Sequence, residues 1–267
     1  MSRGIDHERV PRRAFFAVSA LLIAASTVVT VDWCASMSAM GERSMPGDWT
    51  MSMAWMRMPG QSWPGFAASF LGSWLAMMVS MMLPTLVPTL WRYRLAMGRA
   101  GETRPGWLAT LVGAGYFFVW TGFGMVAFPL GVGLATVARQ LPAVARAVPI
   151  AAGAVVLIAG ALQFTAWKAH YLACSREAPV RDCTLAAGAG MAWRHGLRLG
   201  VHCSYCCASL MAILLVIGVM DLRVMAVVTA AIIVERLAPA GAYVARAIGI
   251  GALGAGLLVI SRAAGFG

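Results

Sequence analysis

The stretch Gly65–Leu90 reads GFAASFLGSWLAMMVSMMLPTLVPTL and contains no charged residue. A membrane-spanning α-helix needs about 20 consecutive, predominantly apolar residues to cross a hydrocarbon core about 30 Å thick. The stretch exceeds this length, and its apolar residues do not alternate with polar ones as they would in a β-barrel strand. It is therefore predicted to be a transmembrane helix.

Further apolar stretches flank this one, and together they predict an all-α, polytopic transmembrane bundle of about seven spans. The composition agrees, because 60% of the chain is hydrophobic, 12% is charged and the mean hydropathy is +0.77. Soluble domains are about 25% charged, so a water-soluble enzyme, a disordered tail and a secreted disulfide scaffold are excluded. The further stretches are Ala14–Val31, Trp107–Phe128, Val148–Trp167, Leu199–Met220, Val224–Leu237 and Ala247–Ile260.

Basic residues between the apolar stretches predict the orientation of the bundle. With the N-terminus in the cytoplasm, 15 of the 21 Lys and Arg residues fall on the cytoplasmic side and six on the other. Cytoplasmic loops of membrane proteins carry the excess of Lys and Arg. We therefore expect a cytoplasmic N-terminus and a periplasmic C-terminus. The net charge of +11 then reflects membrane topology, and no nucleic-acid partner is expected.

This orientation predicts how the chain is divided. Its first helix is longer than the apolar region of a signal peptide, so we expect a membrane anchor. The predicted parts are a cytoplasmic tail (1–13), the first transmembrane helix (14–31), a Met-rich periplasmic loop (32–64), a bundle of about six helices (65–261) and a tail (262–267).

Methionine is concentrated in one part of the chain, since 11 of the 18 Met residues lie between Met37 and Met82. Thioethers are soft ligands that select Cu(I). Several in the periplasmic loop have the spacing at which neighbouring thioethers converge, which predicts a copper collector. The alternative is an apolar segment at the membrane interface, because three tryptophans accompany them. The candidate ligands of the loop are Met51, Met53, Met56 and Met58.

A second group of methionines lies inside the predicted helix Gly65–Leu90. Met77, Met78, Met81 and Met82 form two pairs spaced four residues apart, which places them on one face of the helix. They are candidate ligands of a soft metal, and the alternative is that they only pack.

Cysteine is concentrated as well, because five of the six lie between Cys174 and Cys207. At the start of the fifth apolar stretch, helical spacing places three thiols and an imidazole on about one turn. This turn is predicted to lie near the cytoplasmic face, where thiols stay reduced. This favours metal or redox chemistry over disulfides, and the alternative is that these cysteines pack as small hydrophobes. The candidate ligands are Cys203, Cys206, Cys207 and His202, with His170 and Cys174 at the end of the fourth stretch.

The remaining ionisable pair, Glu235 and Arg236, ends the sixth stretch. Charged residues within a membrane are costly and often functional. The alternative is that the two side chains lie at the interface and pair with each other.

Motifs spread over Gly65–Pro239 resemble, in the same order, those of a bacterial family of predicted metal-binding integral membrane proteins, a domain family of unknown function. The resemblance implies metal binding by the Met and Cys motifs in the bacterial inner (plasma) membrane, and it implies no mechanism. Ala208 departs from the family, in which Trp commonly follows the double Cys. The motifs are Trp74–Pro88 with its Met pairs, Gly115–Trp120, Gln163–Lys168 with Cys174, the CxxCC motif in His202–Cys207 followed by Leu210 and Met211, Gly218–Met220, and Glu235–Pro239.

These features lead to the hypothesis of a membrane protein that binds or handles copper, with another soft metal as the alternative. Copper would pass from the outer methionines to the methionines in the second helix and then to the Cys and His ligands. A second hypothesis is a subunit of a membrane-bound copper oxidoreductase. Such an enzyme would need histidine ligands for Cu(II), and the chain has only four histidines. A structural accessory subunit is the third. The expected partners are the lipid bilayer, the soft metal ion and other membrane protein subunits.

Overall fold

The computed structural model describes residues 3–39, 41, 43–45, 49–172, 188–238 and 241–264. It is all-α, as the sequence predicts, apart from two strands of three residues each that pair antiparallel between the first two helices. The helices are α1 (Arg3–Ala39), α2 (Trp63–Arg99), α3 (Pro105–Gln140), α4 (Pro142–Leu162), α6 (Ala189–Ile217), α7 (Leu222–Leu237) and α8 (Gly241–Ala263). The strands are β1 (Arg43–Met45) and β2 (Trp49–Met51), followed by a 3-10 turn (Met53–Trp55).

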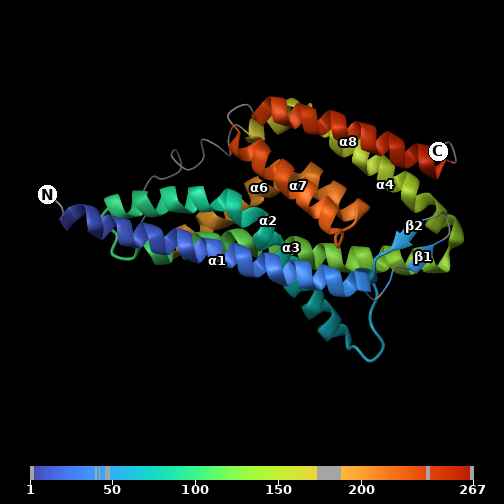
Figure 1. The fold of residues 1–267 in the computed structure, drawn as a ribbon, viewed down its shortest axis with the longest axis horizontal. Helices are drawn as coiled ribbons and strands as arrows, with labels where there is room; N and C mark the ends of the chain where they lie inside the picture. Colours follow the sequence, from blue (N-terminus) through green and yellow to red (C-terminus); the bar gives the residue numbers. More distant parts are fainter. Residues whose placement is uncertain are drawn as a thin grey trace.

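The helices run back and forth along the long axis of the molecule, with α1 along one side and the α4–α8 pair along the other (Figure 1). Among the described residues, six helices are long and apolar enough to cross a membrane. The exception is α7, which was predicted as the sixth span but has 16 residues and a length of about 24 Å at 1.5 Å per residue. It still returns the chain to the end where α8 begins, so α1 begins and α8 ends at opposite ends of the bundle (Figure 1).

Several helices extend beyond the apolar stretches that predict them. Helix α6 begins at Ala189, about three turns before the predicted Leu199. The CxxCC motif therefore lies near the middle of α6 and not at its opening, which corrects the sequence prediction. The added turns carry Arg194 and Arg198, which hydropathy alone assigns to a loop.

Glycines let α3 and α6 pack with their backbones in contact. A Cβ atom on Gly115 would lie 2.7 Å from the Trp193 carbonyl oxygen, and one on Gly196 would overlap the Val112 carbonyl oxygen. Small residues at helix interfaces allow such close approach in membranes. The contact fixes α3 against the segment of α6 that carries the cysteines.

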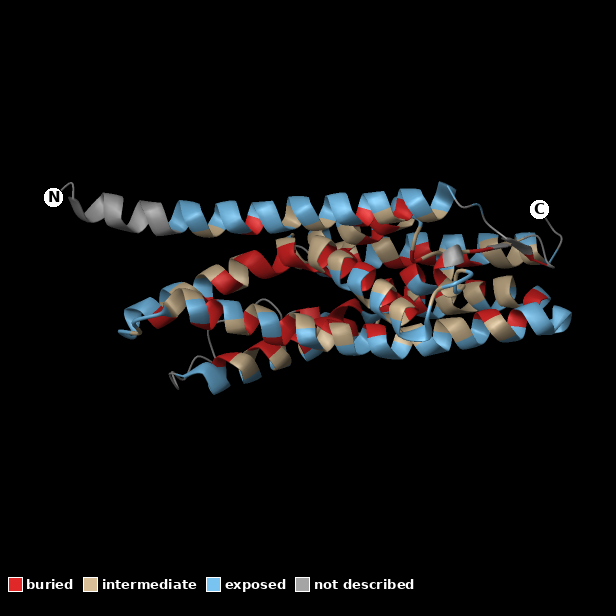
Figure 2. Ribbon diagram, turned by 90° about the horizontal axis from the view of Figure 1, so that it is seen from below, coloured by how far each residue is buried: buried red, intermediate tan, exposed pale blue. Residues whose placement is uncertain are grey.

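The core lies in the middle of the bundle, where buried residues from most helices meet (Figure 2). Helix α2 runs through this core, with 61% of its most apolar window buried, whereas α1 buries 11% of its own. The exposed side chains of α1 include Leu21 and Val28. Large exposed apolar surfaces of this kind mark contact with another apolar phase, so we expect them to face lipid.

Candidate metal centre

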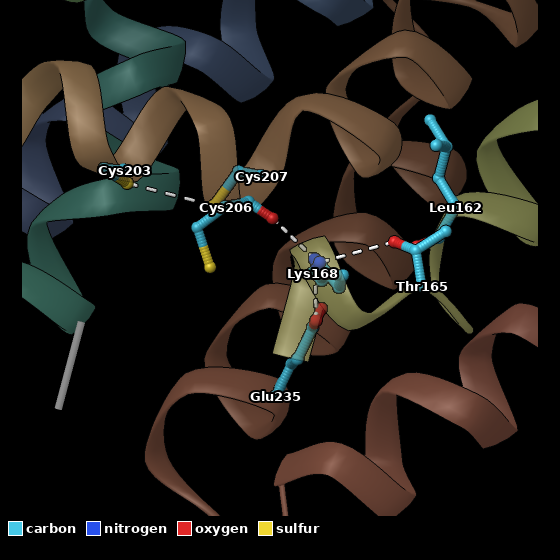
Figure 3. A network of polar contacts seen from close by, with 7 residues as sticks. All are labelled: Leu162, Thr165, Lys168, Cys203, Cys206, Cys207 and Glu235. Atoms are coloured by element: carbon cyan, nitrogen blue, oxygen red, sulfur yellow. Dashed lines mark hydrogen bonds and ion pairs between the residues drawn. The ribbon is translucent and has the colours of Figure 1, made fainter. Parts of the chain in front are cut away.

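The three cysteines of the CxxCC motif are buried at the centre of the bundle as free thiols. The sulfur atoms of Cys203 and Cys207 are 3.8 Å apart, as their one-turn separation on α6 predicts. The Cys206 side chain interacts with that of Cys207, and Figure 3 shows its sulfur directed away from Cys203. The helix thus presents one close pair of thiols, with a third beside it.

The Cys203 sulfur accepts hydrogen bonds from two other helices. The Tyr116 hydroxyl of α3 donates to it over 2.9 Å, and Arg236 Nη1 of α7 donates over 3.0 Å. Arg236 Nη1 also donates to the Thr85 hydroxyl of α2 over 3.2 Å. Three helices therefore meet at one sulfur, and α2 is connected to it through Arg236. The thiolate is the form of cysteine that ligates metals, and hydrogen bonds from charged donors are the stronger ones.

A buried ion pair lies directly beside the cysteines (Figure 3). Lys168 Nζ is 2.7 Å from Glu235 Oε1 and donates to the Cys206 carbonyl oxygen over 2.5 Å. Lys168 belongs to a helical segment at 166–172, and both charged side chains are 2% exposed. Glu235 therefore pairs with Lys168 and Arg236 contacts Cys203, so the alternative in which Glu235 and Arg236 pair only with each other is not observed.

The predicted histidine ligands lie beside the thiols but face other groups. His202 is partly buried, and its Nε2 atom is 3.1 Å from the Tyr171 carbonyl oxygen. His170 is exposed and its ring packs edge-on against that of Tyr171. Cys174, the predicted partner of His170, lies outside the described residues. The structure thus brings together the CxxCC thiols and leaves both imidazoles at their edge.

The methionines of α2 form a continuous buried stripe in the core, no member of which is more than 3% exposed. Thr85, which contacts Arg236, lies one turn after the end of the stripe. The stripe and the thiol pair belong to the same core cluster. Its members are Met77, Met78, Met81 and Met82.

The methionines of the loop between α1 and α2 lie in two places. Met51 packs with Met45 against alanines of α3 and α4, where the Trp49 indole donates to the Ala145 carbonyl oxygen over 2.9 Å. Met56 and Met58 line a cavity of about 100 Å³ together with Met37 of α1, and Met56 also packs against the cluster that contains Met51. Met53 lies in the 3-10 turn, and its side chain is outside the described part of the structure.

Sequence reasoning missed the polar groups that position the thiols. Tyr116 and Lys168 lie within motifs that carry the family resemblance, yet nothing in the sequence assigns them a contact. Lys168 did offer a signal, because a lysine placed directly after an apolar stretch is a candidate for intramembrane pairing. The partners of Cys203 could not be found this way, since they come from helices far apart in the sequence.

The arrangement suits a soft, singly charged metal ion. Within the described ranges, no three His, Cys, Asp or Glu side chains are arranged to hold a metal. Structural Zn²⁺ sites need four such ligands. The core instead offers two close thiols and a stripe of thioethers, which are the donors that select Cu(I).

Comparison with known proteins identifies the family. The model of the PpoB2 family, which is described as copper chaperone, matches residues 71–259. This range covers well over half of the chain and contains the Met stripe and the CxxCC motif. No curated protein and no solved structure matches the chain. The expectation of a metal-binding family is confirmed at this level, and the chain belongs to the PpoB2 family of copper chaperones.

Proposed function

We propose that this chain binds Cu(I) within the bacterial inner membrane and passes it along sulfur ligands, from the thioethers of α2 to the thiols of α6. Copper is the cargo in this proposal. The family supports the choice of metal, and the six apolar helices support a multi-pass position in the bilayer.

One observation carries the proposal. Arg236 Nη1 touches both the Cys203 sulfur and the Thr85 hydroxyl, and Thr85 lies one turn from Met81 and Met82 on α2. The turn of α2 that follows the Met stripe is therefore joined to Cys203 of the thiol pair through the Arg236 side chain.

The positive charge of Cu(I) favours its movement from the thioethers to the thiols. A charge inside a bilayer is costly, and neutral thioethers cannot neutralise Cu(I). Thiolates can. With Cys203 as the thiolate beside Arg236, Cu(I) bound between Cys203 and Cys207 would release the Cys207 thiol proton, so that two thiolates balance the copper and the guanidinium. Copper should therefore bind more tightly at the thiols than at the stripe, without a change of oxidation state.

The test is a competition experiment on the whole protein in detergent, in which a chromogenic Cu(I) chelator is titrated under anaerobic conditions. Cys203→Ser and Cys207→Ser each keep the approximate size of the side chain and remove a thiol. We expect each to weaken Cu(I) binding about tenfold or more, because even outer-shell changes at metal sites cost that much. The matched control is Ser204→Ala, a buried change on the same helix. Equal binding by the control and the Cys variants would reject the proposal.

A second pair of variants tests the stripe. Met78→Leu with Met82→Leu removes two thioethers and preserves volume, at a packing cost below about 1.5 kcal/mol per site. We expect slower loading of the thiol pair at unchanged thermal stability. Met97→Leu is the control, because Met97 is a buried methionine of α2 outside the stripe. Equal loading rates would exclude the stripe from the route.

A further inference from the structure

A third cluster of sulfur atoms lies near the end of α1, apart from the stripe and the CxxCC motif. Cys34 is 1% exposed, on a helix that otherwise buries little of its surface. Its sulfur is 3.9 Å from the Met220 sulfur and 4.0 Å from the Met225 sulfur. We propose that Cys34, Met220 and Met225 form a second Cu(I) site.

The two methionines flank the start of α7. Asp221 caps this helix, accepting hydrogen bonds from the backbone N–H of Arg223 over 2.7 Å and of Val224 over 3.2 Å. Met220 precedes the cap and Met225 lies four residues after it. Apolar residues at these two positions pack against each other as a staple. Cys34 contacts both of the methionines at these positions.

The distances fit a three-coordinate soft metal. Metal–sulfur bonds are about 2.3 Å long, as for Zn–S, and three sulfurs at that distance in a trigonal plane are about 4.0 Å apart. Two edges of such a triangle are observed here. Sulfur atoms that merely pack have similar separations, so the distances need a second observation.

That observation is a small cavity against the cluster. Cys34, Met77 and Met220 line a space of about 10 Å³, which is roughly enough for one water molecule. The lining hydroxyls of Thr30 and Ser73 donate within their own helices. Cys34, Met77 and Met220 are therefore the lining residues that carry soft donors.

The position of the cluster gives it a role. The larger cavity lined by Met37, Met56 and Met58 also contains Met220 in its wall, and Met77 at the other side begins the stripe of α2. The site therefore lies between the outer methionines and the stripe. This inference rests on the proposed function, since Cys34 would be the first thiol that incoming copper meets. Binding exchanges the thiol proton for Cu(I), and the proton leaves to solvent.

The experiment uses the full chain with Cys34 as its only cysteine, so that the CxxCC thiols cannot contribute. We expect one equivalent of Cu(I) to bind, to protect Cys34 from alkylation, and to show only sulfur neighbours in copper K-edge absorption. In this protein Met220→Leu and Met225→Leu should each weaken binding about tenfold, whereas the exposed Met125→Leu should not. The replaced cysteines are Cys174, Cys183, Cys203, Cys206 and Cys207.

Two results would overturn the inference: no protection of Cys34 by Cu(I), or equal binding by the Met220, Met225 and Met125 variants. Protection of Cys34 is also read in the protein that keeps both methionines, so the inference stays testable if a variant fails to fold. A Cys34→Ser protein with an intact CxxCC motif distinguishes this outcome from failure of the proposed function. If the proposed function fails, this protein binds no Cu(I) at its thiols.

Discussion

Arg236 Nη1 lies 3.0 Å from the Cys203 sulfur, so a charged guanidinium donates a hydrogen bond to a buried thiol inside an apolar bundle. A guanidinium cannot lose its proton in a protein, and an uncompensated charge in a bilayer is costly. A thiolate at Cys203 would compensate it. We infer that the positive charge of Arg236 stabilises the negatively charged thiolate form of Cys203, the sulfur proposed to receive copper.

The first prediction follows from this contact. Arg236→Gln removes the charge while keeping a hydrogen-bond donor, and we expect a 10- to 100-fold loss of Cu(I) affinity, as for other outer-shell partners of metal ligands. Arg236→Lys should recover part of the loss, because lysine restores the charge but not the planar fork that reaches both Thr85 and Cys203. The measurement is anaerobic competition against a Cu(I) chelator.

The control for this prediction is Arg223→Gln, an exposed arginine of the same helix. It changes the net charge of the protein by the same amount and touches no thiol in the described structure. A loss of affinity as large in this control as in Arg236→Gln would show that the effect is general electrostatics and not the contact with Cys203.

The second prediction concerns the pair Lys168 and Glu235. Glu235→Gln leaves the buried Lys168 ammonium without its carboxylate, and breaking one side of a buried pair costs about 3–5 kcal/mol. We expect a clear fall of the melting temperature in detergent. The double variant Lys168→Met with Glu235→Gln removes both charges and should recover much of the loss. A double variant less stable than Glu235→Gln would contradict a mainly electrostatic pairing.

The fold could be predicted from the sequence because its signal is local. Apolar stretches such as Gly65–Leu90 are long enough to be recognised one at a time, and the all-α bundle follows from their number. Helix ends were harder, since Arg194 and Arg198 belong to α6 although their charges interrupt the apolar pattern. The close approach of α3 and α6 at Gly115 explains why those turns stay helical.

The candidate site could be predicted only where its members share one helix. Helical spacing correctly placed Cys207 one turn from Cys203. It could not find Tyr116 or Arg236, whose contacts with Cys203 depend on how separate helices pack. For the same reason spacing grouped Met51 with Met58, whereas Met51 packs with Met45 against alanines of α3 and α4 and Met58 lines the cavity.

The third prediction tests the orientation that the basic residues indicate. In a cysteine-free protein, a cysteine placed at Ser52, after β2, should react with a membrane-impermeant maleimide added to intact cells from the periplasmic side. A cysteine placed at Ala100, after α2, should react only once the inner membrane is opened. Both positions lie at the ends of described elements, so accessibility reports on the side of the membrane. The reverse labelling pattern would place the Met-rich loop in the cytoplasm.

The last prediction separates two sets of methionines in the outer loop. Met56 and Met58 line the cavity that also contains Met37 and Met220, whereas Met51 is not among its lining residues and packs with Met45 against alanines of α3 and α4. Met56→Leu with Met58→Leu should therefore lower the rate at which copper added from outside reaches the thiols. Met51→Leu should leave this rate unchanged, and neither change should cost more than about 1.5 kcal/mol of stability per site, because Leu and Met have similar volumes.

The measurement is the rate at which added Cu(I) protects the CxxCC thiols from alkylation in reconstituted vesicles. Met51→Leu is matched to the cavity variants in residue type and in membrane side, so it reports any general effect of losing a thioether. A larger delay in Met51→Leu than in the cavity variants would place copper entry at the β1–β2 hairpin. Equal rates in all variants and the unmodified protein would leave the loop methionines as packing residues, and copper would then enter without them.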